Sequence, residues 1–265
     1  MLVSAVAYKR LDGLQVVAPY FEADGVTLYL GDCREILPTL SLRADLVIAD
    51  PPYAETSLAW DRWPSGWPAL LADYADSMWC FGSMRMFLDR RDDFAAWKLS
   101  QDVVWEKHNG SGFAADRFKR VHEIATHWYR GDWAEIHHDT PTIPGEPRPS
   151  ARIRMREGPG HQGAIGASRY EYGDTRLARS VIYSPSMHKQ AVNETQKPEG
   201  IVEPLARYGC PRGGLVLDPF AGSGTTGAVA KALGMRAVLI EFREEQCEHA
   251  ANRLSQACLD LGALS

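Results

Sequence analysis

The chain lacks the features that mark membrane proteins, secreted scaffolds and zinc proteins. It contains no apolar run of about 18 residues, and Met1 to Arg10 are too mixed to resemble an export signal, so neither a membrane function nor an exported one has support. Its five cysteines are odd in number and include no Cys-x-x-Cys pair, which argues against a disulfide scaffold and a zinc site. We therefore expect reduced thiols, no bound metal and a cytoplasmic location.

An overall excess of positive charge is also missing, because the formal net charge is −5 at pH 7. The charge is nevertheless segregated. Residues 147–190 contain eight Lys or Arg and three acidic residues, so this segment carries +5 and the remainder carries −10. A local basic segment of this kind can meet a polyanion although the whole chain is acidic.

The composition is that of an ordinary globular protein, with 45% hydrophobic and 24% charged residues. A length of 265 residues suits one well-buried α/β domain with an insert, or at most two small domains.

The stretch Asp50-Pro51-Pro52-Tyr53 follows the apolar run 44–49, which predicts a buried strand that ends at a rigid corner. The prolines remove two N–H donors, so the corner offers two acceptors, the Asp50 carboxylate and the Pro51 carbonyl. Tyr53 adds an aromatic face. This set suits a planar ring with an exocyclic NH2 group, such as adenine or cytosine. An ordinary loop after a strand fits the four residues equally well.

A second motif occupies residues 215–227, where an apolar stretch runs into a glycine-rich turn. A helix is predicted over 226–233 with Gly234 after its end, followed by a strand over 236–240 that leads to Glu241. This βαβ pattern is typical of nucleotide binding, because glycines let the backbone approach the ligand and an acidic residue can bind two ribose hydroxyls.

Gly222, Gly224 and Gly227 also satisfy the G-x-G-x-x-G spacing of dinucleotide-binding proteins, so a nicotinamide-dependent dehydrogenase is an alternative. The residues 218–220, Asp-Pro-Phe, favour another family. With the glycines they resemble the F-x-G-x-G motif by which amino-methyltransferases bind S-adenosylmethionine (AdoMet). The D-P-P-Y motif lies 168 residues earlier, and this order resembles the β class of DNA amino-methyltransferases. The resemblance spans roughly residues 28–254.

The resemblance implies an α/β fold of the AdoMet-dependent methyltransferase type, which is Rossmann-like. Its mostly parallel seven-stranded sheet ends in an antiparallel hairpin, and a small recognition segment is inserted. Residues 20–133 and 190–265 would form the catalytic domain in permuted order, and 134–189 would form the target-recognition insert.

The resemblance also implies methyl transfer from AdoMet to an exocyclic amine of duplex DNA, with the target base flipped out of the helix. The expected catalytic residues are Asp50, Pro51, Pro52 and Tyr53. The expected cofactor-binding residues are Asp32, Cys33, Asp50, Gln196, Lys197, Asp218, Phe220, Gly222, Ser223, Gly224, Thr225, Thr226, Glu241 and Phe242. Within this set, the resemblance places Asp32 on the adenine amine, although a helix cap explains Asp32 equally well. Residues 195–198, Thr-Gln-Lys-Pro, resemble a family motif from which Lys197 could reach the AdoMet carboxylate.

The expected DNA-binding residues are arginines of the basic segment: Arg148, Arg152, Arg154, Arg156, Arg169, Arg176 and Arg179. Arginine occurs at every second position from 152 to 156. In an extended segment this spacing would place three guanidinium groups on one face, where they could bind phosphates and guanine edges. A disordered insert that only neutralises the acidic domain is the alternative. Relatives of this type are often dimers, so a homodimer is expected.

An aspartate at position 50 favours N6 of adenine, because family members with serine there tend toward N4 of cytosine. N4-cytosine methylation and a catalytically idle DNA-binding protein remain alternatives. The resemblance implies a bacterial or phage enzyme of the restriction-modification type. His122 and Glu123 are interpreted as structural. The eight tryptophans, all within 60–133, indicate a core or a protomer interface rather than base stacking.

Overall fold

The computed structural model describes residues 8–11, 14–111, 116–145, 174–185 and 196–260. The chain divides into two compact units. The larger unit comprises Met1–Asp139 and Ser180–Ser265, and the smaller unit comprises Thr140–Arg179.

The larger unit is built on a sheet that has nine strands within the described residues, in the order β11-β7-β8-β6-β5-β12-β13-β4-β3. Five neighbouring pairs are parallel, and the β3–β4, β6–β8 and β7–β8 pairs are antiparallel. The strands are β3 (Phe21–Ala23), β4 (Val26–Leu30), β5 (Leu46–Ala49), β6 (Ser77–Gly82), β7 (Lys98–Ser111), β8 (Arg120–Tyr129), β11 (Val181–Tyr183), β12 (Leu215–Asp218) and β13 (Arg236–Glu241).

The mostly parallel sheet and its antiparallel β7–β8 hairpin confirm the predicted fold class. The described part of the sheet has two strands more than the expected seven, because short strands β3 and β11 extend its edges. Strand β3 pairs with β4 across a two-residue turn, Asp24-Gly25, in which both residues have positive φ. An Asp-Gly pair is well suited to such a turn, since glycine and aspartate tolerate the left-handed region.

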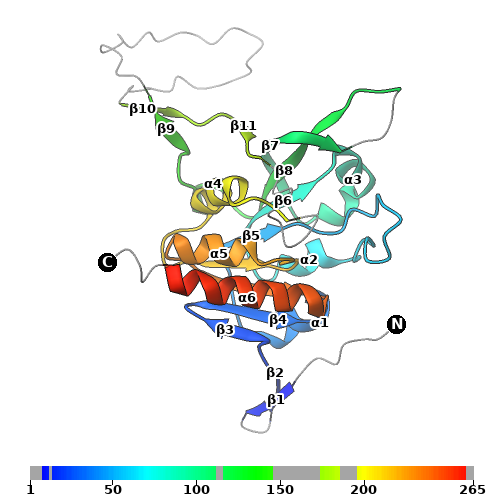
Figure 1. The fold of residues 1–265 in the computed structure, drawn as a ribbon, viewed down its shortest axis with the longest axis vertical. Helices are drawn as coiled ribbons and strands as arrows, with labels where there is room; N and C mark the ends of the chain where they lie inside the picture. Colours follow the sequence, from blue (N-terminus) through cyan, green and yellow to red (C-terminus); the bar gives the residue numbers. More distant parts are fainter. Residues whose placement is uncertain (1–7, 12–13, 112–115, 146–173, 186–195, 261–265) are drawn as a thin grey trace. The chain divides into compact units, whose positions relative to one another are not determined.

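Helices cover both faces of the sheet (Figure 1). One face packs against α4 (Glu199–Gly209), α5 (Thr225–Ala232) and α6 (Glu244–Asp260). The other packs against α1 (Cys33–Ile36), α2 (Trp67–Leu71) and α3 (Met84–Asp89), with short 3-10 helices at Leu37–Thr39 and Arg91–Phe94. A third short 3-10 helix, Trp133–Glu135, packs through Trp133 on the α4 side. Every residue of β5, β6 and β12 is therefore buried, as expected for central strands with two covered faces.

Tryptophans contribute to the core on both faces. Trp67, Trp79, Trp97 and Trp105 are buried, which confirms the core interpretation for these four. Trp60 differs, since it is 38% exposed and the Arg243 guanidinium lies 4.9 Å from its ring centroid.

The remaining described strands form two small hairpins. In the larger unit, β1 (Tyr8–Leu11) pairs with β2 (Leu14–Val17). In the smaller unit, β9 (Thr142–Pro144) pairs with β10 (Thr175–Leu177), and Arg176 lies opposite Ile143 with its side chain exposed. The expected insert, 134–189, contains the whole smaller unit. Among the described residues, no helix has the length and apolar character needed to cross a membrane.

His127 on β8 is a buried ionisable group that the fold holds in its neutral form. Its ring packs against Trp79 and Tyr208, with centroid distances of 4.8 and 5.3 Å, and Ser77 Oγ lies 3.0 Å from its Nε2. Burial lowers the pKa of His127 to about 4. An unfolded histidine has a pKa of about 6.5. The unfolded state therefore binds the proton first, and this contribution to stability is lost as the pH falls from 6.5 toward 4.

We expect His127→Gln to remove this pH dependence. The unfolding free energy of the wild type, minus that of the variant, should shrink by up to about 3 kcal/mol between pH 7 and pH 4. Urea unfolding across this range measures the difference. A constant difference would show that His127 does not become protonated on unfolding.

Candidate active site

Four acidic residues gather at one edge of the sheet. Asp218 and Glu241 end β12 and β13, and Asp50 and Asp32 follow β5 and β4. These are four adjacent strands that run in parallel, so their carboxyl ends share that edge. From β5 the chain continues to β6 on one side, whereas from β12 it continues to β13 on the other. Ligands of open α/β sheets bind at such a switch point.

The glycine-rich turn after β12 leaves a bare backbone beside this crevice. Gly222 and Gly224 have φ values of +50° and +76°, where a side chain would be strained. No heavy atom lies within 4 Å of a Cβ built on Gly222, so space is open there. Gly227 has another purpose, because a Cβ on it would approach Leu239 Cδ1 to 2.7 Å. It lets α5 pack closely on the sheet. Gly234, with φ +67°, follows the end of α5 as predicted.

Asp218 holds the two ends of this turn. Its Oδ1 accepts a hydrogen bond from the Phe220 N–H at 2.9 Å, and its Oδ2 accepts one from Thr226 Oγ1 at 2.5 Å. Burial raises the pKa of Asp218 to about 7, and the negative charges of Asp50 and Glu241 add to the effect. A cation placed beside it would favour the ionised form.

Glu241 fixes the middle of the turn to the end of β13. Its Oε2 accepts from the Gly222 N–H and its Oε1 from the Arg243 N–H, both at 2.9 Å. Each carboxylate oxygen can accept a second hydrogen bond, so Glu241 keeps capacity for ligand hydroxyls.

The Asp50 corner holds a carboxylate between two donors. Tyr53 Oη donates to Asp50 Oδ1 at 2.9 Å, and Lys197 Nζ donates to Oδ2 at 2.5 Å. Burial raises the pKa of Tyr53, which keeps its hydroxyl protonated as a donor. The Asp50 side chain remains 26% exposed, so a ligand can still reach it.

The loop beyond the corner is ordered by Asp61, a residue that the sequence analysis did not identify. The buried Asp61 carboxylate accepts three hydrogen bonds, from the N–H groups of Ala54, Glu55 and Thr56, at 2.7 to 2.9 Å. Ala54 has a left-handed φ of +58°, a strained conformation for a residue with a side chain. These bonds stabilise that turn directly after Tyr53.

Asp50 and Lys197 belong to a larger cluster of charged side chains, which also contains Glu123 and Lys107. Lys197 Nζ lies 3.3 Å from Glu123 Oε2, and Lys107 pairs with Glu123 Oε1. Burial alone would raise the pKa of Glu123, but the two ammonium groups outweigh it and lower the pKa to about 2. Glu123, which the sequence analysis interpreted as structural, is thus linked to Asp50 through Lys197. No local pattern indicated this position, because it depends on the register of the hairpin and on Lys197 from a distant segment.

The structure brings most of the predicted cofactor-binding residues to the crevice edge. Ser223, Thr225 and Thr226 are buried at the start of α5, and Thr225 Oγ1 donates to the Lys197 carbonyl at 3.0 Å. Gln196 directly precedes Lys197. Lys197, which was expected at the AdoMet carboxylate, is paired here with Asp50.

The sequence allows two roles for Asp32, a contact with the adenine amine of the cofactor and a helix cap. In the structure Asp32 caps helix α1. Its Oδ1 accepts from the Arg34 N–H at 2.9 Å at the start of α1, and it pairs with the Arg34 guanidinium. Cys33 is buried beside it, and burial raises the pKa of its thiol to about 12. Phe242 is 64% exposed and offers a stacking face, whereas Phe220 packs edge-on against Trp67.

The predicted DNA-binding arginines are only partly described. Arg176 and Arg179 are exposed residues of the smaller unit. The other five, Arg148, Arg152, Arg154, Arg156 and Arg169, lie outside the described residues. In the part of the chain that is described, no group of three His, Cys, Asp or Glu side chains is arranged to hold a metal ion.

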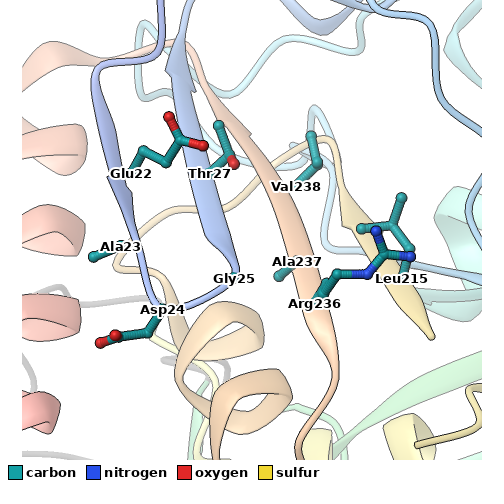
Figure 2. Close-up of a pocket in the computed structure, with 9 residues that line it drawn as sticks. All are labelled: Glu22, Ala23, Asp24, Gly25, Thr27, Leu215, Arg236, Ala237 and Val238. Carbon is teal, nitrogen blue, oxygen red and sulfur yellow. The ribbon is translucent and has the colours of Figure 1, made fainter. Parts of the chain in front are cut away.

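A separate hollow of about 390 Å³ lies at the opposite edge of the sheet, where β4, β12 and β13 begin (Figure 2). Gly25, Leu215 and Arg236 line it at the amino ends of these strands. It contains none of the predicted site residues.

Comparison with known proteins identifies the family. The family model described as DNA methylase (N6_N4_Mtase) matches residues 44–252. The chain belongs to this DNA methylase family. S-adenosylmethionine is the methyl donor of this methyltransferase family, and DNA is the substrate.

Two curated relatives are similar over most of their length. Type II methyltransferase M.ScaI of Streptomyces caespitosus is 24% identical over 257 residues, which cover 89% of this chain and 83% of M.ScaI. Type II methyltransferase M2.LlaDCHI of Lactococcus lactis subsp. cremoris is 25% identical over 278 residues, covering 95% of this chain and 97% of the relative.

Solved structures share the fold. The M1.HpyAVI–SAM complex matches with a TM-score of 0.58 at 21% identity, covering 86% of this chain and 99% of that one. The PvuII DNA methyltransferase, described as cytosine-N4-specific, matches with a TM-score of 0.60 at 14% identity, covering 90% and 93%.

The residues present at the crevice suit AdoMet. The open backbone at Gly222 leaves room for a close approach, and Glu241 has acceptor capacity for ribose hydroxyls. AdoMet carries a sulfonium and an ammonium group, and a cation of this kind beside the buried Asp218 would favour its ionised form.

Asp218 should limit the stability of the ligand-free protein. Its pKa is about 7 in the native state, whereas the ordinary pKa of an aspartate side chain is 3.8. The native state holds the proton longer, so this contribution to stability is lost as the pH rises from 4 through 7. At pH 8 we expect the unfolding free energy of Asp218→Asn to exceed that of the wild type by up to about 4 kcal/mol. This difference in unfolding free energy should vanish near pH 4.

The same variant should bind AdoMet more weakly, because it lacks the anion. Urea unfolding at several pH values and calorimetric titration with AdoMet measure the two effects. A gain in stability that does not depend on pH would contradict a titrating Asp218. Because His127 titrates over much of the same range with the opposite sign, only the difference from wild type is informative.

Proposed function

We propose that the enzyme transfers a methyl group from AdoMet to N6 of adenine in duplex DNA, after extrusion of the base. The observation that carries the proposal is the arrangement at the switch point. The Asp50 corner follows β5, and the glycine-rich turn follows the adjacent strand β12. An acceptor corner for an exocyclic amine thus lies next to a turn suited to the cofactor. The aspartate at position 50 favours adenine over cytosine.

In this proposal the larger unit holds the cofactor through two acidic side chains and the glycine-rich turn. Glu241 binds the ribose hydroxyls, and Asp218 faces the cationic part. Asp32, Cys33, Gln196, Phe220 and Phe242, together with the residues from 222 to 226, line the remainder. When bound, AdoMet supplies an electrophilic methyl group.

The role of Asp50 is to activate a poor nucleophile. The lone pair of an adenine amine is delocalised into the ring. Hydrogen bonds from its two hydrogens to the Asp50 carboxylate and the Pro51 carbonyl would localise that pair and orient it. Each oxygen of Asp50 accepts one protein donor and has capacity for another. The carboxylate then stabilises the positive charge that develops on the amine, and the methylated amine releases its surplus proton to water.

Tyr53 supplies the stacking face for the extruded base. Extrusion costs a few kcal/mol. Stacking on an aromatic ring recovers roughly 1–3 kcal/mol per base. The Asp61 carboxylate, which orders the loop after Tyr53, keeps this face in place.

The test is to incubate the enzyme with AdoMet and mixed-sequence duplex DNA, digest the DNA to nucleosides and analyse them by mass spectrometry. We expect N6-methyldeoxyadenosine. N4-methyldeoxycytidine would retain the mechanism and overturn the choice of base. If neither methylated nucleoside forms, although AdoMet binding is shown separately, the proposed function is overturned.

Asp50→Ala and Asp50→Asn should abolish the product, because both remove the carboxylate that accepts from the amine. AdoMet affinity should stay within about tenfold, a change of about 1.4 kcal/mol. Retained turnover in either variant would remove Asp50 from the mechanism.

We further propose that the basic insert, 134–189, contacts DNA through its arginines. Arg154→Ala combined with Arg156→Ala should weaken DNA binding, and should reduce the slope of log affinity against log salt by about two, one for each lost phosphate contact. AdoMet affinity should not change. Fluorescence anisotropy with labelled duplex at several salt concentrations measures the slope. An unchanged slope would place DNA recognition elsewhere.

A further inference from the structure

The Asp50 carboxylate lies at the end of a chain of four charges. Asp50, Lys197, Glu123 and Lys107 alternate in sign, and each touches the next. Their side chains are at most 26% exposed. The sum of the four charges is zero. Because solvent screens partly buried charges less than exposed ones, removal of one charge acts on the others more strongly than it would at the surface.

Glu123 occupies the centre of this chain and comes from the antiparallel hairpin. It lies on β8 directly opposite Trp105 of β7. Its Oε1 pairs with Lys107. Its Oε2 is fully buried and has no hydrogen bond of good geometry among the described residues, so the Lys197 ammonium 3.3 Å away is the group that compensates it.

Lys197 is confined by these partners. Its ammonium lies 5.1 Å from the Phe81 ring centroid and 6.0 Å from that of Trp105, with Asp50 on one side and Glu123 on the other. An ammonium with Asp50 as its only partner would cancel the negative charge of Asp50. An ammonium shared between two carboxylates compensates the charge of Asp50 only in part.

We propose that Glu123 is a positioning residue for methyl transfer, which holds Lys197 between two carboxylates so that Asp50 stays oriented and its charge stays available. The inference rests on the proposed function. During transfer, positive charge moves from the donor onto the amine, beside Asp50. A surplus positive charge at this point opposes the reaction more than it opposes binding.

Glu123→Gln changes the sum of the four charges from zero to +1 with little change in shape. We expect kcat to fall roughly 10- to 100-fold, by analogy with residues that orient the ligands of a metal site. KM for AdoMet should change little. Glu106→Gln is the matched control, since Glu106 lies on the same hairpin with an exposed side chain, and it should methylate like the wild type.

The double variant Lys107→Gln/Glu123→Gln separates charge from packing. It restores a sum of zero, and its two amides can hydrogen-bond to each other. We expect its kcat to exceed that of Glu123→Gln. A purely structural role predicts the opposite, because the double variant loses one more native contact.

Single-turnover and steady-state assays on the wild type, the control and both variants decide the matter. Wild-type kcat in Glu123→Gln, or no recovery in the double variant, would overturn the positioning role while leaving the proposed function intact. Wild-type protein that methylates neither adenine nor cytosine would overturn the proposed function, and the role of Glu123 with it.

Discussion

The ion pair between Lys197 and Asp50 joins two segments that are 147 residues apart in the chain, and much of the site depends on it. Lys197 belongs to the segment before α4, and its carbonyl accepts from Thr225 at the start of α5. Arg253 of α6 donates to the same Thr225 hydroxyl at 2.8 Å. The acceptor corner and the cofactor turn are therefore fastened to one short stretch of backbone.

Burying an ion pair costs several kcal/mol of lost hydration per ion, which a single partner rarely recovers. The network around Lys197 spreads this cost over two carboxylates and a second ammonium. A rigid frame surrounds it, since the prolines after Asp50 fix the backbone and Asp61 orders the loop that follows. The site thus contains charged side chains whose burial is unfavourable, and a rigid backbone prevents them from turning outward into water.

Local patterns predicted a large part of this molecule. The apolar run before Asp50, the glycine-rich turn and the helix closed by Gly234 each follow from short stretches of sequence, and the structure places them within a residue or two. The order of the two family motifs, with D-P-P-Y before F-x-G-x-G, predicted the mostly parallel sheet and its antiparallel hairpin. Edge strands β3 and β11 escaped prediction because three-residue strands leave almost no periodic signal.

The charge network could not be predicted in the same way. The role of Glu123 depends on its register opposite Trp105 and on the arrival of Lys197 from a distant segment, and neither is encoded locally. The same limitation applies to Lys197, whose motif indicated a cofactor contact while its nearest partner in the fold is Asp50. Asp32 shows the converse, since a local capping pattern was sufficient to explain its position.

The order of strands has a consequence for how the protein is made. Strands β12 and β13 lie between β5 and β4, although the chain reaches them long after both. Until residues through Glu241 have left the ribosome, the two strands that join β5 to β4 are missing, and the exposed edges and apolar faces of β5 and β4 must be kept from other chains. The nascent polypeptide carries the Asp50 corner early but acquires its active site late, so no partly synthesised chain ending before β12 has both halves of the crevice.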